Sequence, residues 1–341
     1  MIRRISAILI ILGGLALIIV PITEHVWSGA APAKAMISSF KPVMSSASLQ
    51  IVQTDLAQLA AGNHQLTTQV MPALAGQLHM TPQQLQQAMS TNFPQVSTGM
   101  AALPGILTHF DNYGSLLQSQ LANYQAASSM PASGIPLTAM PWGFLLAGVL
   151  AISFGVGMLV TKGKGPAIAA LVLGAAILIS SASLSFPHKA VSADHMMSGL
   201  RPVMNAQAVT GMGEALGVVN GMITQMENQM FPYVANQLHM TPTAFNTFMA
   251  TQFPTVGETL KNMPSTMALF QGMHNKIESN LSNYQKASAI PSMTFLVWLL
   301  VGVGAVGVLG GLAGIAGSAS TDSLSDKKNS VNSPKQASTS V

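Results

Sequence analysis

Four long apolar runs dominate the hydropathy pattern of the chain, at residues 5–20, 142–160, 167–183 and 295–316. Each run is close to the ~20 apolar residues that a helix needs to cross a bilayer. They predict four membrane-spanning helices, at residues 1–20, 142–161, 167–185 and 293–317. Only residues 162–166 join the second span to the third, and so short a connection makes these two spans an antiparallel helical hairpin.

The chain also repeats itself with an offset of 160 residues. Residues 77–82, Gln-Leu-His-Met-Thr-Pro, recur unchanged at 237–242, and the tripeptides at 42–44 and 123–125 recur at 202–204 and 283–285. About a third of the positions between 40 and 131 are identical across this offset. Because self-similarity at a fixed period marks a repeat architecture, we predict a tandem duplication of one membrane-anchored unit, with residues 1–160 and 161–317 as the copies.

The first apolar run has two interpretations, a cleaved signal peptide or a retained signal anchor. Residues 31–33, Ala-Pro-Ala, resemble a cleavage site but lie well beyond the end of the run. Across the offset the run corresponds to the internal run at 167–183, which cannot be a signal peptide. We therefore expect the first run to be retained as a span.

Basic residues that flank the spans predict the topology, since cytoplasmic flanks are enriched in Lys and Arg. Arg3, Arg4, Lys162, Lys164 and the lysines at 327, 328 and 335 fall on one side of the predicted membrane. The segments on the other side are close to charge-balanced. We predict cytoplasmic termini and two large helical extracytoplasmic domains, at 21–141 and 186–292. The repeats are then parallel and related by an axis along the membrane normal.

Composition supports this class of protein. Hydrophobic residues make up 49% of the 341 residues and charged residues only 7%, which indicates an integral membrane protein with several spans. The net charge of +4 comes from scattered basic residues, so we expect no nucleic-acid partner. There is no cysteine, which excludes disulfides and thiolate sites. The Gln- and Ala-rich segments favour a bacterial plasma membrane.

The segments between the spans are predicted to be helical, because glycine is sparse there and good helix formers dominate. Thr81 and Thr241, each followed by proline, have the pattern of a helix N-cap. Gln84 completes a capping box in the first copy only. Pro94 and Pro104 are each expected to end or restart a helix.

Two long helices are expected in the first of these segments, at about 35–64 and 105–129. The second of them carries apolar residues at intervals of three and four, the pattern of one buried face. Residues 318–341 are almost without apolar side chains, and we expect them to form a disordered tail.

The sequence contains no recognisable catalytic pattern. A duplicated enzyme would carry ionisable groups at equivalent positions, yet Asp55 corresponds to Ala215 and Asp111 to Gln271. No nucleophile elbow, phosphate-binding loop or metalloprotease helix is present. The four apolar runs contain no ionisable residue, which argues against a proton or ion pathway. We predict a non-enzymatic protein without a cofactor.

The histidines that the copies share are each followed by methionine, as His79-Met80 and His239-Met240. Imidazole and thioether ligands suit Cu(I), so these residues are weak candidates for a metal site in a chain with 23 methionines. We favour the alternative that the histidines bond a local carbonyl and that methionine fills the core. A methionine stripe at 222, 226 and 230 is not shared by the first copy.

Three other sets of residues are candidates for contacts. Tyr124 and Tyr284 are expected to pack or to anchor at the membrane interface. Lys41 and Arg201, the shared basic position between the spans, are expected to be solvated or to contact anionic lipid or a partner. The fourth span contains GxxxG spacings, which allow close approach of helices within the four spans or between chains: Gly307 with Gly311, and Gly310 with Gly314.

Three functions remain open. The leading hypothesis is an accessory or scaffold subunit of a cell-envelope complex, which contacts membrane lipid and docks another membrane or envelope protein through its paired outer domains. A large exposed apolar patch would favour it. The second is a carrier of lipid or another apolar molecule, favoured by an apolar cavity of several hundred cubic ångströms. The third, copper binding, requires His79 and His239 to face a shared cleft.

Overall fold

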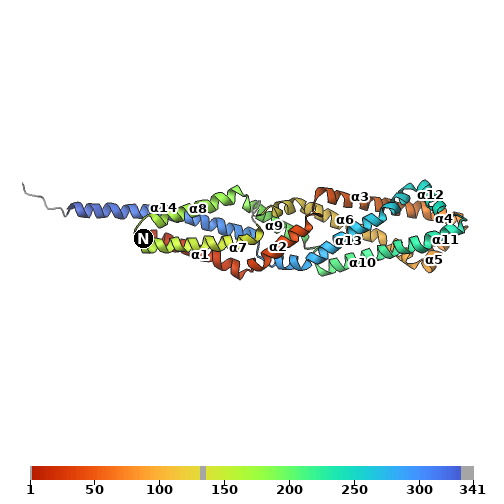
Figure 1. Ribbon diagram of the computed structural model, residues 1–341, viewed down its shortest axis with the longest axis horizontal. Helices are drawn as coiled ribbons and strands as arrows, with labels where there is room; N and C mark the ends of the chain where they lie inside the picture. Colours follow the sequence, from red (N-terminus) through yellow and green to blue (C-terminus); the bar gives the residue numbers. More distant parts are fainter. Residues whose placement is uncertain (1, 131–135, 332–341) are drawn as a thin grey trace, which may run out of the picture. The chain divides into compact units, whose positions relative to one another are not determined.

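The computed structural model describes residues 2–130 and 136–331, with side chains described as far as Ser318. Throughout these residues the chain is built from helices and the turns between them, without a strand (Figure 1). Four helices in this described part are long and apolar enough to cross a membrane. For these residues the predictions of an all-α protein and of four helices long and apolar enough to span a membrane are confirmed.

The helices between the spans recur in the same order, and the bounds from α9 to α13 are each 160 higher than those from α2 to α6. The first half contains α1 (Ile2–Thr23), α2 (Val26–Phe40), α3 (Ser46–Gln65), the π-helix η1 (Leu66–Val70), α4 (Met71–Gln77), α5 (Pro82–Asn92), α6 (Pro94–Ser128), the 3-10 turn η2 (Leu137–Ala139) and α7 (Met140–Val160). The second half contains α8 (Gly165–Ser183), α9 (Phe186–Leu200), α10 (Ala206–Gln225), the π-helix η3 (Met226–Met230), α11 (Phe231–Gln237), α12 (Pro242–Gln252), α13 (Pro254–Ser288) and α14 (Met293–Val331).

The chain divides into two compact units, which we call the span unit and the intervening unit. The span unit comprises Met1–Ala35, Gln125–His195 and Gln285–Val341. In it α1 packs against α7 and α14, and α8 packs against α14 and α7. Its apolar residues form clusters between these helices, while large apolar side chains on their other faces are exposed. That distribution is what lipid-facing helices require.

The short turn between α7 and α8 is held by Arg3 of α1. The Arg3 guanidinium donates to the carbonyl oxygen of Lys162 at 2.9 Å and to that of Gly163 at 3.1 Å, and it also donates to the carbonyl oxygen of Thr161. Carbonyl groups just past a helix end lack intrahelical partners. The Arg3 side chain supplies hydrogen-bond donors to three such carbonyls of the turn. The start of α1 and the α7–α8 turn therefore lie at the same end of the span unit.

The intervening unit comprises Met36–Tyr124 and Met196–Tyr284, so both halves of the chain contribute to one compact body. Phe110 of α6 packs on Phe270 of α13, its counterpart across the offset, with ring centroids 4.9 Å apart. The two halves therefore contact each other at positions that correspond across the offset of 160 residues. An apolar cluster of the unit takes buried residues from both halves.

Local predictions have mixed outcomes. Thr81 and Thr241 cap α5 and α12, and the capping box is present with Gln84 in α5 and not in α12, as predicted. Pro94 does begin α6, but the expected break at Pro104 is wrong because α6 continues through it. Pro104 lies on an exposed face, and α6 continues there although proline lacks the amide that would bond the carbonyl four residues earlier.

The single helix expected at 35–64 is also wrong, since a turn at residues 41–45 separates α2 from α3. Pro42 lies in this turn, and the Ser45 side chain accepts the amide proton of Ser48 to begin α3. At the other end of the chain α14 continues past the expected start of the tail at Ser318 and ends at Val331. The rest of the predicted tail lies outside the described residues.

Candidate functional site: a methionine-lined cavity

An apolar cavity of about 150 Å³ lies inside the intervening unit. Its walls come from α3 to α6 of the first half and from α10 to α13 of the second. The lining residues are Leu59, Gly62, Asn63, Leu66, Val70, Met71, Leu74, Leu78, Met80, Leu85, Ala88, Met89, Asn92, Phe93, Met100, Leu103, Met222, Met226, Met230, Phe231, Tyr233, Val234, Gln237, Phe245, Met249, Val256, Thr259, Leu260 and Met263. Neither half encloses this space without the other.

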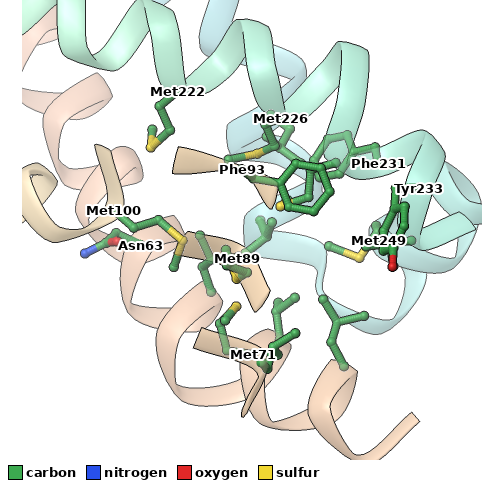
Figure 2. Close-up of a pocket in the computed structure, with 18 of the residues that line it drawn as sticks. Asn63, Met71, Met89, Phe93, Met100, Met222, Met226, Phe231, Tyr233 and Met249 are labelled. Atoms are coloured by element: carbon green, nitrogen blue, oxygen red, sulfur yellow. The ribbon is translucent and has the colours of Figure 1, made fainter. Parts of the chain in front are cut away.

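Methionine is the commonest residue of the cavity wall. Nine of the 29 lining residues are methionine, compared with 23 of 341 in the chain. Figure 2 shows Met71, Met89 and Met100 facing Met222 and Met226 across the cavity. Unbranched thioether side chains are flexible and polarizable, so a wall made of them adapts to the shape of what it contacts.

The cavity is electrically neutral, since none of its lining residues is charged and none is histidine. Its polar groups are few, namely the side chains of Asn63, Asn92, Tyr233, Gln237 and Thr259. An unpaired charge would be costly to bury in such surroundings. The wall therefore suits an uncharged apolar group and offers few positions for hydrogen bonds.

Both π-helices lie at this cavity. Leu66 and Val70 of η1 and Met226 and Met230 of η3 line it. In η1 the freed helical carbonyls are partly satisfied by side chains, because the Thr68 hydroxyl donates to the carbonyl oxygen of His64 at 2.7 Å. Single π-turns inside α-helices are rare and occur frequently at functional sites.

A reciprocal pair of glutamines holds the two halves together beside each π-turn. The Oε1 atom of Gln225, at the end of α10, accepts the backbone amide protons of Gln95 and Val96 at 2.8 and 3.0 Å. In the same way, Oε1 of Gln65, at the end of α3, accepts the amide proton of Val256 at 2.9 Å. Each glutamine thus caps the first turn of the long helix from the other half, α6 or α13.

These glutamines are needed because the local N-cap residues cannot do the same. Phe93 and Phe253 stand at the N-cap positions of α6 and α13 and have no side-chain oxygen. The first amides of a helix have no intrahelical acceptor. Our sequence analysis missed both glutamines. The available signal was that Gln65 and Gln225 are identical across the offset and that each Phe-Pro helix start lacks a capping side chain.

The predicted metal candidates have a backbone role. His79 and His239 follow the ends of α4 and α11 with φ of 53°, in the left-handed region. The amide of His79 donates to the carbonyl oxygen of Gly76 at 3.2 Å, and that of Met80 donates to Ala75 at 2.8 Å. This is the Schellman ending of a helix. The same pair of bonds recurs at His239 and Met240 in the second half.

The side chains of these pairs do not come together as ligands. His79 and His239 are exposed, whereas Met80 lines the cavity and Met240 packs against the apolar cluster. Among the described residues no group of three or more His, Asp or Glu side chains is placed to hold a metal ion. The copper hypothesis is therefore not supported by the position of the shared histidines.

The shared tyrosines are packing residues of the intervening unit. The Tyr124 hydroxyl donates to the carbonyl oxygen of Ile37 at 2.7 Å, and that of Tyr284 donates to Met197 at 2.7 Å. Both carbonyls belong to the last turn of a helix, α2 or α9, where intrahelical donors are missing. Burial raises the pKa of both tyrosines, an effect that the Arg201 charge partly opposes at Tyr284.

The shared basic residues stand one residue past the ends of α2 and α9. Lys41 and Arg201 are both exposed. Pro42 and Pro202 follow them and help to end these helices, whose last carbonyls the tyrosines then satisfy. The two shared tripeptides, Pro-Val-Met and Asn-Tyr-Gln, are thus parts of one local arrangement that occurs twice.

The four glycines of the GxxxG spacings in the fourth span lie against neighbouring helices. An added Cβ at Gly307 would lie 3.1 Å from the Cα of Gly174, and one at Gly311 would lie 2.7 Å from the carbonyl oxygen of Ala167. Both contacts are with α8. Gly310 faces Ile10 of α1, and Gly314 faces Met158 of α7. These spacings serve packing among the four spans of one chain.

Comparison of the sequence with protein-family models and with curated proteins finds no match to either.

Proposed function

We propose that this chain is a non-enzymatic, multi-pass membrane protein whose intervening unit binds an apolar molecule in the methionine-lined cavity. The observation that carries the proposal is the cavity itself, with nine methionines and no charged side chain in its wall. Empty cavities of this size with apolar walls stay dry and take up small apolar molecules, about the size of benzene. An aromatic ring, or the end of a longer hydrocarbon, fits this description.

We further propose the topology in which the chain is a tandem duplication, with cytoplasmic termini and an extracytoplasmic intervening unit. Three observations support it. The bounds of α2 to α6 and of α9 to α13 differ by 160, the glutamine caps are reciprocal, and basic residues gather at the start of α1 and the α7–α8 turn. A ligand held in this unit would be available outside the cytoplasm of a bacterial plasma membrane.

The scaffold function stays a prediction with less support. A docking protein was expected to carry a large exposed apolar patch. In the intervening unit, all of whose residues are described, the exposed large apolar side chains are Ile51, Met80 and Tyr233. Native mass spectrometry of the protein extracted from its own membrane tests both functions, since a bound small molecule favours the carrier and a stoichiometric protein favours the scaffold.

A direct test is photolabelling of the full-length protein in lipid nanodiscs with 3-trifluoromethyl-3-phenyldiazirine, an apolar aromatic probe. We expect saturable labelling of peptides from α4, α5 and η3, suppressed by excess benzene. Labelling of the four spans by probe dissolved in lipid provides an internal reference in the same molecule. The proposal fails if the cavity peptides of the wild-type protein are labelled no more than exposed helices.

A matched pair of variants sharpens this test. Ala88 lines the cavity, and its counterpart in the second half is Phe248, which already packs against the apolar cluster. Ala88→Phe therefore introduces the side chain that already stands at the corresponding position, 248, of the second half. The added ring should fill the cavity and abolish labelling of its peptides. Ala122→Phe, on an exposed face of α6, adds the same ring elsewhere and should leave that labelling intact.

A further inference from the structure

An open groove of about 480 Å³ lies beside the cavity, on the second half of the intervening unit. It is formed by η3, α11, α12 and α13. Four residues line both spaces, namely Phe231, Phe245, Met249 and Leu260. The rings of Phe231 and Phe245 lie 5.7 Å apart between centroids. These shared side chains thus form a partition between the cavity and the groove.

The groove differs from the cavity in its charge. Glu227 of η3 and Lys261 of α13 both line it, and both side chains are exposed. Neither forms an ion pair with the other or with another described side chain. A carboxylate and an ammonium group are therefore free to meet a ligand at the mouth of an otherwise apolar space.

The first half does not carry this chemistry. The counterparts of Glu227 and Lys261 across the offset are Thr67 and Ala101. The two rings of the partition correspond to residues 71 and 85, which are methionine and leucine. An amphiphilic site with both charges is therefore a property of the second half, and it makes the binding region asymmetric.

The helices are packed closely where the groove meets the bundle. A Cβ added at Gly257 of α13 would lie 2.8 Å from the Cα of Ala250 in α12, and both residues line the groove. The floor of the groove is thus backbone against backbone and has little room to shift. Met249 is the unbranched side chain of the partition, and methionine adapts its shape with little cost. We expect its rotation to join the groove to the cavity.

We propose that the groove is the headgroup site of the ligand, and that the ligand is a single-chain amphiphile with a zwitterionic headgroup whose apolar end enters the cavity. This inference rests on the proposed function, because it assigns a ligand class to the same cavity. A headgroup that carries both a cation and an anion is complementary to Glu227 and Lys261 together. Headgroups of one sign would meet one attractive and one repulsive charge.

The test is competition against the diazirine photolabel by four amphiphiles with the same octyl chain: octylphosphocholine, octyl sulfate, octyltrimethylammonium and octanol. All are used below their micelle concentrations with the full-length protein in nanodiscs. Exposed charge pairs contribute little each, so we expect octylphosphocholine to compete at roughly three- to tenfold lower concentration than the singly charged compounds.

Charge reversals separate the two side chains. Glu227→Lys should shift the preference toward octyl sulfate, and Lys261→Glu should shift it toward octyltrimethylammonium. The double variant E227K/K261E exchanges the charges and should restore the preference for the zwitterion. The exchange E214K/K276E, at exposed positions outside the groove, changes the same residue types and should leave the preference unchanged.

The outcomes distinguish the inference from the function on which it rests. If octanol competes as well as octylphosphocholine and the reversals change nothing, the headgroup site is refuted while apolar binding stands. If no amphiphile displaces a label that benzene still suppresses, the amphiphile site is refuted while apolar binding stands. The proposed function fails as well only if the cavity peptides are labelled no more than exposed helices. A preference that follows the charge in each single variant and returns in the double variant supports the site.

Discussion

Replacing Gln225 by methionine should weaken the start of α6 while leaving the shape of the side chain nearly unchanged. Gln225 is 9% exposed, and its Oε1 atom accepts amide protons from Gln95 and Val96. Methionine has a similar length but no strong acceptor. Val96 is fully buried, so water cannot easily replace the lost bond to its amide.

The expected loss follows from these two bonds. An ordinary hydrogen bond contributes about 1 kcal/mol net, and a buried donor left without a partner costs about 1–3 kcal/mol. We expect Gln225→Met to cost about 2–3 kcal/mol locally. Gln65 accepts only the Val256 amide proton in the equivalent place, so Gln65→Met should cost less, about 1–2 kcal/mol.

Hydrogen–deuterium exchange with mass spectrometry measures this opening directly in the full-length protein. At about 1.4 kcal/mol per factor of ten, the amides in the first turn of α6 should exchange roughly 30- to 150-fold faster in the Gln225 variant. Gln229→Met is the control, because exposed Gln229 only accepts from the Gln225 side chain. Equal exchange of this turn in the two variants would refute the capping role.

Three further changes test other parts of the argument. Gly311→Ala should lower the melting temperature in nanodiscs, at a cost of about 1–3 kcal/mol, because its Cβ would lie 2.7 Å from the carbonyl oxygen of Ala167. Gly302→Ala is the control, since a Cβ there meets no atom within 4 Å. Equal melting temperatures of the two variants would contradict the packing role of Gly311. His79→Gly should be tolerated and His79→Val should lose about 1–2 kcal/mol, since only glycine adopts positive φ without strain. The buried Tyr124 has a pKa raised above 10, so its contribution to stability is present below pH 10 and is lost as the pH rises through the raised value. In Tyr124→Phe the free energy of unfolding should fall less steeply as the pH rises above 10. An unchanged dependence on pH would show that Tyr124 does not contribute to it.

Features with local causes could be predicted from the sequence. The four spans follow from uninterrupted apolar runs, and the starts of α5 and α12 follow from the Thr-Pro pairs at 81 and 241, because an N-cap and its helix are adjacent in the chain. The apolar spacing in the second half of α6 also predicted its buried face, as Phe110, Leu117 and Tyr124 are all buried. Each of these signals is contained within a few turns of helix.

Features that depend on contacts between the halves could not be predicted. The bonds from Gln225 to the start of α6 join residues 129 and 130 positions apart, and a helix start without a capping side chain does not indicate where its acceptor lies. The same applies to the cavity. Its methionines are spread from position 71 to position 263, and only the folded unit brings them to one wall. The stripe at 222, 226 and 230 had no visible counterpart, so it resembled ordinary core filling.

The packing around Met222 indicates why this stripe has no counterpart. At two reciprocal contacts between the halves the sizes of the side chains are exchanged. Gly62 of α3 faces Thr259 of α13, where an added Cβ would lie 2.9 Å from the threonine Cβ, and Gly99 of α6 faces Met222 of α10, where it would lie 2.5 Å away. Position 222 corresponds to 62 and position 259 to 99. A large residue in one half is therefore matched by glycine in the other.

Such matching is expected only if the two halves pack as one unit, because an unmatched change at either contact would force helices apart. It also gives the asymmetry of the cavity a physical basis, since Gly99 provides the space in which Met222 reaches the wall. Unlike walls would suit the proposed ligand if it is itself asymmetric, and the exchanged pairs allow the two halves to differ without loss of packing.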